Sequence, residues 1–170
     1  NVSISANTTW AKGTGTITLA GTTSANINFA GKSVESLTVT LQSGATKTLT
    51  GNVTTASLSV EGGAIGGTFA IGTYDLTVTG NSSLTNIFTN PTVTIGASSN
   101  TGWTTANMTI GANTTITCFG NSKINVSGNW SNSGTFNPST STVTFNGSTA
   151  DTTQIVNNGS SSFYNVVINN

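Results

Sequence analysis

"TTASLSV", residues 54–60, returns almost unchanged as "TTANMTI" at residues 104–110. A second segment, "IGTYDLTVTGN" at residues 71–81, matches "FGNSKINVSGN" at residues 119–129, after a nearly equal shift along the chain. Two unrelated loops would not keep that register. Self-similarity of this kind is typical of architectures built from stacked units. The two matches therefore predict a repeat protein.

The rest of the chain has the periodicity of short β-strands. Apolar residues two positions apart recur about every ten residues, for example at Leu37/Val39, Leu58/Val60 and Ile124/Val126. Gly-Asn, Asn-Gly, Gly-Gly and Ser-Gly pairs lie between these segments and permit a positive φ at tight turns. Helical spacing is not sustained anywhere. The predicted fold class is all-β, with one face of each strand turned inward.

A longer match sets the expected architecture. "TITLAGTT" at residues 16–23 falls on "TVTFNGST" at residues 142–149. If the alignment is shifted by three more residues, Val34, Leu37 and Val39 align with Phe163, Val166 and Ile168. Stacked coils restart a pattern in this way, whereas a closed sandwich finishes its sheet. We expect one β-solenoid, a parallel β-helix-like domain, over residues 1–170; the alternative is a β-sandwich pilin-like fold with donor-strand exchange.

The segment "GNWSNSGTFNPSTSTVTFNGS" (residues 128–148), followed by "SSSFYNVVINN" (residues 160–170), carries a family resemblance. It resembles the β-strand repeat of prokaryotic surface, adhesin-like and phage-associated proteins. In that repeat a Gly-Asn-Trp, a Thr-Val-Thr-Phe-Asn-Gly strand and a Phe-Tyr/Asn-Asn-Leu-like strand follow in this order. The resemblance covers the whole chain with variations and is best at residues 124–170 and 9–41. It implies a hemagglutinin- or autotransporter-passenger-like solenoid with a structural, adhesive or fibre role, and it carries over no catalytic residue.

The composition excludes several classes of partner. The 170 residues contain 4 Lys+Arg, 4 Asp+Glu and no His, with a formal net charge of +0. Charged residues are 5% of the chain, against about 25% in an ordinary soluble domain. No basic patch is present for nucleic acid or an anionic membrane surface, and no apolar run is long enough for membrane insertion. The single cysteine, Cys118, can form no intramolecular disulfide.

The few acidic residues do not suggest an enzyme. The four carboxylates belong to Glu35, Glu61, Asp75 and Asp151, and none has an acidic neighbour within five residues. Glycosidic cleavage needs a carboxylate pair, zinc sites need His/Cys sets, and calcium sites need clustered acids. We therefore predict no catalytic residue, no metal site and no cofactor.

Asparagine provides another candidate site. Asn-x-Ser/Thr sequons begin at Asn1 and at nine further candidates for glycan attachment, which are Asn7, Asn52, Asn81, Asn107, Asn113, Asn125, Asn129, Asn146 and Asn158. Glycans on several of them would suit an extracellular filament. The alternative role is structural, since asparagine tolerates a positive φ at turns and can stack as amide ladders from coil to coil.

Two further surfaces are conceivable from side-chain type. Trp103 and Trp130 could stack on sugar rings, although an aromatic residue in a charge-poor solenoid more often fills the interior or seals an end. The Thr-x-Thr segments could form a flat hydroxyl array, as in ice-binding proteins. Their intervals along the chain are uneven, which argues against one ladder, and Thr is in any case a favoured outward residue of strands.

The termini suggest self-association. "NVSISANTTW" and "SSFYNVVINN" are both strand-like to the very end, with few charged gatekeepers and no polar cap. The expected self-association residues are Asn1, Val2, Ile4, Trp10, Phe163, Val166 and Ile168. Either the chain is a segment of a longer repeat protein and continues beyond these strands, or another chain completes their ladder. In the second case coils could stack end to end, or a terminal strand could be donated to a neighbour.

We expect a non-enzymatic subunit or segment of an extracellular filament, cell-surface stalk or virion fibre, with itself as partner. The alternative is a carbohydrate-binding adhesive module or a phage fibre that binds a host glycan.

Overall fold

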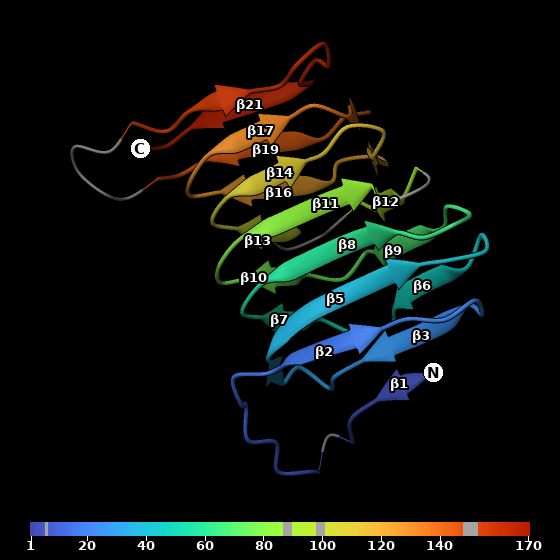
Figure 1. Ribbon diagram of the computed structural model, residues 1–170. Coiled ribbons are helices and arrows are strands. Elements are labelled where there is room, and N and C mark those ends of the chain that lie inside the picture. The colour runs from blue at the N-terminus through green and yellow to red at the C-terminus, as the bar shows by residue number, and fades with distance from the viewer. Residues whose placement is uncertain (6, 87–89, 98–100, 148–152) are drawn as a thin grey trace.

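The computed structural model describes residues 1–5, 7–86, 90–97, 101–147 and 153–170. These residues form three parallel β-sheets of seven strands each and contain no helix (Figure 1). Sheet A contains, in spatial order, β1 (Val2–Ser3), β3 (Ala25–Asn28), β6 (Thr46–Leu49), β9 (Thr68–Gly72), β12 (Thr92–Ile95), β15 (Thr115–Cys118) and β18 (Thr135–Asn137).

Sheets B and C run beside sheet A along the same axis. Sheet B contains β2 (Thr16–Leu19), β5 (Ser36–Leu41), β8 (Leu58–Gly62), β11 (Ser82–Asn86), β14 (Met108–Ile110), β17 (Trp130–Asn132) and β20 (Val156–Asn157). Sheet C contains β4 (Ser33–Val34), β7 (Val53–Thr55), β10 (Leu76–Val78), β13 (Trp103–Thr105), β16 (Lys123–Val126), β19 (Thr142–Phe145) and β21 (Asn165–Ile168).

The chain visits the sheets in the order B, A, C and then returns to B one strand further along. β5, β6 and β7 make one such coil, and β8, β9 and β10 make the next. Every pairing between described strands is parallel and joins neighbouring coils, as β5 with β8 and β8 with β11. The molecule is therefore a β-solenoid. The β-sandwich alternative, which requires antiparallel strands, is wrong.

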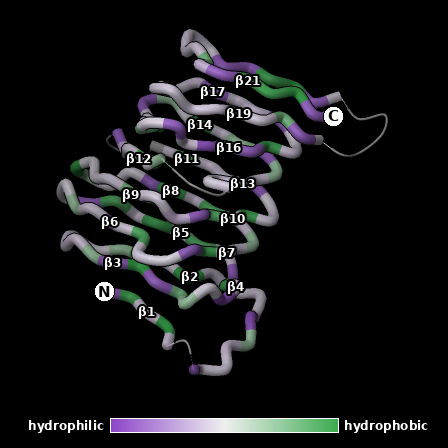
Figure 2. Tube along the Cα trace, turned by 180° about the vertical axis from the view of Figure 1, so that it is seen from behind, coloured by the Kyte–Doolittle hydropathy of each residue, from purple (hydrophilic) through white to green (hydrophobic). Residues whose placement is uncertain are grey.

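The core lies between the three sheets, because alternate residues of each strand point to the axis. In β5 the inward residues Leu37, Val39 and Leu41 are at most 1% exposed, while the residues between them are half-buried. Register stacks such inward residues from coil to coil, as with Leu37 on Leu58 and Val39 on Val60. Figure 2 shows that short hydrophobic segments recur along the coiled chain.

A tryptophan fits into the core where a small residue leaves room. Ser82 occupies the inward column of sheet B between Leu58 and Met108. Trp103 is fully buried, and its Nε1 donates to Ser82 Oγ at 3.2 Å. Ser82 Oγ in turn donates to Thr105 Oγ1 at 2.9 Å. The indole thus fills the space and keeps its N–H satisfied, as a buried tryptophan requires.

The structure confirms the two shorter sequence matches. Thr54 pairs with Thr77 and Thr77 with Thr104, so the match of residues 54–60 to residues 104–110 spans two coils. The match of residues 71–81 to residues 119–129 also spans two coils, from β10 through β13 to β16. The repeating unit is therefore one coil, and each of these matches skips a coil.

The match of residues 16–23 to residues 142–149 is wrong as a structural repeat, because it places β2 of sheet B on β19 of sheet C. The shifted alignment likewise places β5 of sheet B on β21 of sheet C. Strands of all three sheets share one alternating pattern, so sequence similarity alone does not identify the sheet.

Replacing Trp103 with alanine should lower the free energy of unfolding by about 3–5 kcal/mol, because a large fully buried side chain leaves a cavity. Trp10, which is 37% exposed, is the matched control, and Trp10→Ala should cost much less. Chemical denaturation followed by circular dichroism measures both. Equal losses in the two variants would contradict the core position of Trp103.

Candidate functional site

The last described coil has exposed apolar residues at positions whose counterparts in the preceding coil are buried in the core. Val166 and Ile168 in β21 pair with Val143 and Phe145 in β19, which are 0% and 2% exposed. Val166 and Ile168 face the same way but are 45% and 65% exposed. In sheet B, Val156 of β20 pairs with Trp130 and is 42% exposed. We call β20, β21 and these inward apolar residues the C-terminal edge.

An aromatic cluster closes the interior just below the C-terminal edge. Trp130, Phe136 and Phe145 come from sheets B, A and C, and Phe163 lies over them. The ring centroid of Phe163 is 5.4 Å from that of Trp130 and 5.8 Å from those of Phe136 and Phe145. Such edge-on and tilted contacts stabilise aromatic pairs. Phe163, an expected self-association residue, therefore packs within its own chain.

A polar network covers the sheet A side of this end. Asn132 is 2% exposed, and its Nδ2 lies 3.1 Å from Asn158 Oδ1 and 3.2 Å from Ser161 Oγ. Ser161 Oγ accepts the backbone N–H of Phe136 at 3.0 Å, a donor on the outer strand of sheet A. Trp130 Nε1 donates to Asn158 Oδ1 at 2.9 Å. The expectation of no polar cap is therefore wrong for sheet A, while β21 has no strand on its outer side among the described residues.

The N-terminal end is less strand-like than its sequence. Val2 lies in β1, which pairs with β3, and Asn1 Oδ1 accepts the backbone N–H of Asn26 at 3.1 Å. Ile4 packs against the core. Trp10 is partly exposed and lies in no strand, so among the described residues up to Trp10 the predicted strand is wrong beyond Ser3.

A carboxylate holds the segment that leads into β2. Glu35 Oε1 accepts the backbone N–H of Gly13 at 2.7 Å. Hydrogen bonding to Gly13 and to its own backbone N–H lowers the pKa of Glu35, and nearby Lys12 acts in the same direction. The bond ties residues near Gly13 to the corner between β4 and β5.

The sugar-stacking hypothesis for Trp103 and Trp130 is wrong. Both side chains are 0% exposed, so neither presents a ring face to a ligand. The inward alternation of β13 and β17 places them in the core, which was the other interpretation of their sequence context. Aromatic exposure among the described residues is instead found at Trp10, Tyr74, Phe119 and Tyr164.

Several sequon asparagines form an amide ladder at the corner before sheet B. Asn107 Nδ2 donates to Asn81 Oδ1 at 2.8 Å, and Asn107 Oδ1 accepts the backbone N–H of Asn129 at 2.6 Å. Asn129 Oδ1 accepts the backbone N–H of Ile155 at 2.8 Å. The amide-ladder interpretation is confirmed at this corner. Glycan attachment stays a prediction, and Asn7 and Asn113 are exposed positions outside this ladder.

Three other sequon amides also bond within the chain. Asn52 Oδ1 accepts the backbone N–H of Asp75 at 3.0 Å, and Asn125 Nδ2 donates to the carbonyl of Thr101 at 2.7 Å. Asn158 belongs to the polar network described above. Asn146 Oδ1 is buried and has no hydrogen-bond partner among the described residues.

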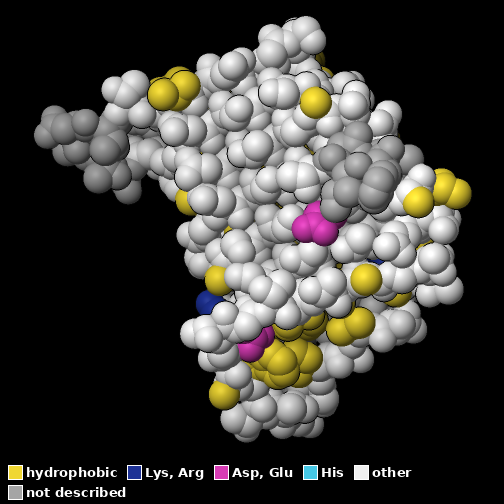
Figure 3. All heavy atoms as spheres, viewed as in Figure 1, with side chains coloured by type: hydrophobic (Ala, Val, Ile, Leu, Met, Phe, Trp, Pro, Cys, Tyr) yellow, Lys and Arg dark blue, Asp and Glu magenta, His cyan; other side chains and the backbone are white. Residues whose placement is uncertain are grey.

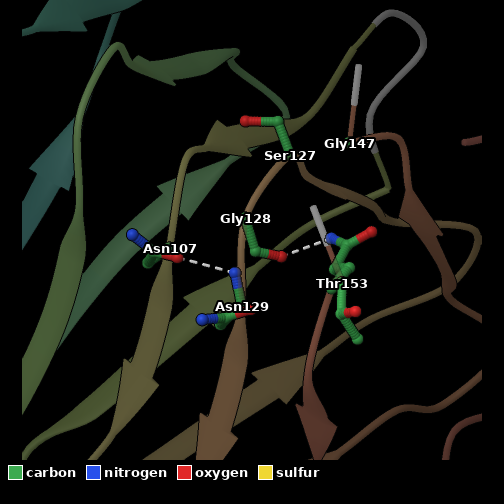
Figure 4. A pocket seen from close by; sticks show the side chains of 7 residues that line it. Asn107, Ser127, Gly128, Asn129, Gly147 and Thr153 are labelled. Atoms are coloured by element: carbon green, nitrogen blue, oxygen red, sulfur yellow. Dashed lines mark hydrogen bonds between the residues drawn. The ribbon is translucent and has the colours of Figure 1, made fainter. Parts of the chain in front are cut away.

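A small polar cavity of about 220 Å³ adjoins the ladder. Its lining residues are Asn107, Ser127, Gly128, Asn129, Gly147, Thr153 and Gln154, and Figure 4 shows the Asn107–Asn129 bond at its side. Gln154 Nε2 donates to the carbonyls of Val126 and Gly128, whereas Gln154 Oε1 has no partner within the described ranges. None of the lining residues is charged, so they offer neutral amide and hydroxyl groups only.

The titratable groups are scattered over the solenoid. Asp75 Oδ1 accepts the backbone N–H of Gly102 at 2.8 Å, and Ser59 Oγ donates to Glu61 at 3.2 Å. Asp151 lies outside the described residues. Within the described ranges, no three His, Cys, Asp or Glu residues gather as a metal site would require, and no helix is long and apolar enough to cross a membrane. Burial raises the pKa of the Cys118 thiol, partly offset by the neighbouring Ser122 and Ser141 hydroxyls.

The Thr-x-Thr segments of the sequence are divided among the three sheets, as in β5, β12 and β19, so together they do not form one ladder, as their uneven intervals indicated. Sheet A nevertheless has a threonine ladder that the sequence analysis missed. Its outer face carries one continuous column of threonines in register, Thr46, Thr68, Thr92, Thr115 and Thr135. The intervals between these threonines along the chain are unequal. Strand pairing nevertheless sets the register, because the loops between strands take up the differences in length.

Comparisons with known proteins identify no relative: no family model, no curated protein and no solved structure matches this chain.

Replacing Asn107 with alanine should destabilise the fold by about 1–3 kcal/mol, because a donor to Asn81 and an acceptor for Asn129 are lost together. Asn7→Ala, which removes an exposed sequon outside the ladder, is the control and should be nearly neutral. Thermal unfolding measures both variants. A neutral Asn107→Ala would show that the ladder contributes no stability.

The Glu35 contact should respond to acid. Because the folded pKa lies below the ordinary value of 4.5, the bond is present at neutral pH and is lost as the pH falls through the folded pKa. The amide proton of Gly13, followed by NMR, should therefore titrate with a midpoint below 4.5. Glu35→Gln should abolish this titration and Glu61→Gln should preserve it. A Gly13 signal unaffected by pH would contradict the contact.

Proposed function

We propose that this protein is a non-enzymatic structural β-solenoid of an extracellular filament or surface fibre, and that its copies join end to end through the C-terminal edge. The observation that carries the proposal is the exposure of Val156, Val166 and Ile168, whose counterparts one coil below are buried. A further coil on this edge would bury the same apolar surface again. Burial of apolar surface is the main driving force of association.

The chemistry of the edge favours another β-strand as its partner. β21 is the outermost strand of sheet C, so one row of its backbone N–H and C=O groups faces no strand among the described residues. Charged side chains and proline usually protect an edge strand from pairing with another chain. Residues 153–170 contain neither. An extended segment added to such an edge gains main-chain hydrogen bonds.

End-to-end stacking agrees better with the N-terminal contacts than strand donation does. β1 already pairs with β3 of its own chain, and Ile4 packs on its own core. Donation of this strand would first break those contacts. Stacking instead leaves them in place and brings the first coil of one copy, with the partly exposed Val2 and Trp10, onto the C-terminal edge of the next.

The resemblance of residues 124–170 to the repeats of surface, adhesin-like and phage-associated proteins supports a cell-surface or virion location. The neutral composition supports the same class of function, since the chain has few groups for nucleic acid, metal or acid–base chemistry. Figure 3 shows one face on which charged side chains are few and hydrophobic ones are scattered, apart from a group near the N-terminal end.

Placing a charge on the C-terminal edge should prevent assembly. Val166→Lys and Ile168→Lys put an ammonium group where the next coil would pack, whereas Val167→Lys puts it on the outward column of the same strand, beside Thr144. We expect filaments in electron micrographs of the wild type and of Val167→Lys, and single particles for the other two variants. Single particles of the wild type at high concentration would contradict self-association.

Deletion of residues 1–10 tests the opposite end of the same contact. If the first coil forms half of the contact, the deletion should remove filaments while the circular dichroism spectrum stays that of a β-protein. Filaments of normal length from the deleted chain would show that neither Asn1 nor Trp10 takes part, and would overturn the end-to-end contact proposed here.

A further inference from the structure

The outer face of sheet A presents two neighbouring columns of small, mostly polar side chains. The first column is Thr46, Thr68, Thr92, Thr115 and Thr135. The second column, two residues further along each strand, is Asn26, Thr48, Ala70, Thr94, Thr117 and Asn137. Threonine occupies all five positions of the first column and three of the six positions of the second. β6, β12 and β15 each contain the sequence Thr-x-Thr, and each contributes its two threonines to the same two columns.

Backbone geometry turns the two columns into a lattice. Neighbouring strands lie about 4.7–4.9 Å apart, and alternate residues along a parallel strand lie about 6.6 Å apart. Threonine is branched at Cβ and is therefore stiff at χ1, and the neighbours above and below leave most of these side chains half-buried. The hydroxyl and methyl groups thus repeat in two directions with little conformational freedom to lose on binding.

The hydroxyls of this lattice are available to a partner. Among the described residues, the side-chain bond made on the two columns is the one from Asn137 Nδ2 to Thr117 Oγ1 at 3.3 Å. Each hydroxyl offers one donor and two acceptor lone pairs. A partner that matches the lattice must therefore present both donors and acceptors in a periodic array.

Sheet A differs from the other two faces in having no outward charge on its described strands. Lys47 is the one charged residue in those strands, and it is 3% exposed, with its Nζ donating to the carbonyls of Gly21 and Thr23. Sheet B carries Glu61 between Thr40 and Thr85, and acidic side chains are visible on that face in Figure 3. Sheet C has Lys123 in β16.

We propose that the two threonine columns of sheet A form an ice-binding surface. Ice is an uncharged, periodic array of hydrogen-bond donors and acceptors, which is the chemistry that this lattice complements. Crystalline polysaccharide fits less well, because proteins grip sugar rings with exposed aromatic side chains and the aromatic residues of these strands, Phe69 and Phe136, are buried. The surface lies on the side of the solenoid and does not depend on the end-to-end contact.

The test measures thermal hysteresis and incorporation of the labelled protein into a growing ice hemisphere. The wild type should show both. Thr92→Lys, at the centre of the first column, should reduce activity about tenfold, as loss of a central contact does at other interfaces. Thr77→Lys, on the outward column of sheet C, is the matched control and should retain wild-type activity. The filament assay distinguishes the ice-binding surface from the end-to-end contact, because the Thr92→Lys protein should still form filaments.

Thr92→Val and Thr92→Ser keep the test informative if lysine disturbs the sheet. Valine keeps the branched shape and serine keeps the hydroxyl, and thermal unfolding verifies that each is folded. Lower ice activity in either folded variant supports the lattice. Exclusion of the wild type from ice, equal losses in Thr92→Lys and Thr77→Lys, or binding to microcrystalline cellulose without ice activity would each overturn the proposal.

Discussion

Each coil of this solenoid is completed by its neighbours. A parallel strand bonds to one strand above and one below, and the inward side chains of one coil are shielded by those of the next. Val143 and Val166 show the consequence, because they lie in one column of sheet C and are 0% and 45% exposed. Among the described residues, Val143 has a coil on both sides and Val166 has a coil on one side. Burial in this fold is therefore a property of position along the axis.

The corners between sheets are the second place where polar groups need partners, and neutral side chains supply them. The Asn81–Asn107–Asn129 ladder bonds one coil to the next before sheet B. The Thr105 hydroxyl, with its one proton, lies within hydrogen-bonding distance of the carbonyls of Gly80 and Asn107 in the same corner. Because amides and hydroxyls satisfy the turns, the chain needs few ions, and this explains how a protein with 5% charged residues keeps its buried backbone groups bonded.

The ends and the sides of such a molecule present different chemistry. The C-terminal edge combines apolar side chains with main-chain groups that face no strand among the described residues, which suits another β-strand. The outer face of sheet A combines hydroxyls and methyls without charge, which suits an extended uncharged surface. The two proposals rest on separate residues, so a filament and a lateral binding face are compatible in one chain.

Local spacing in the sequence was sufficient to predict an all-β chain built from coils, because the alternation in short segments and the repeats of residues 54–60 and 71–81 do not depend on contacts between distant residues. For Trp103 and Trp130 it left the core and a sugar-stacking surface as alternatives, and for the sequon asparagines it left ladders and glycan attachment; burial decided the first choice in favour of the core. The match between residues 16–23 and 142–149 failed, since strands of three different sheets share one pattern. The threonine column of sheet A was not predicted because its threonines are unequally spaced along the sequence. Loops of different length take up the differences, and the strands still pair in register. The assignment of each strand to a sheet, the contacts of Asn132, Asn158 and Ser161 beside sheet A, and the position of β21 as the outermost described strand of sheet C came from the three-dimensional structure, because they depend on pairing between residues far apart in the sequence.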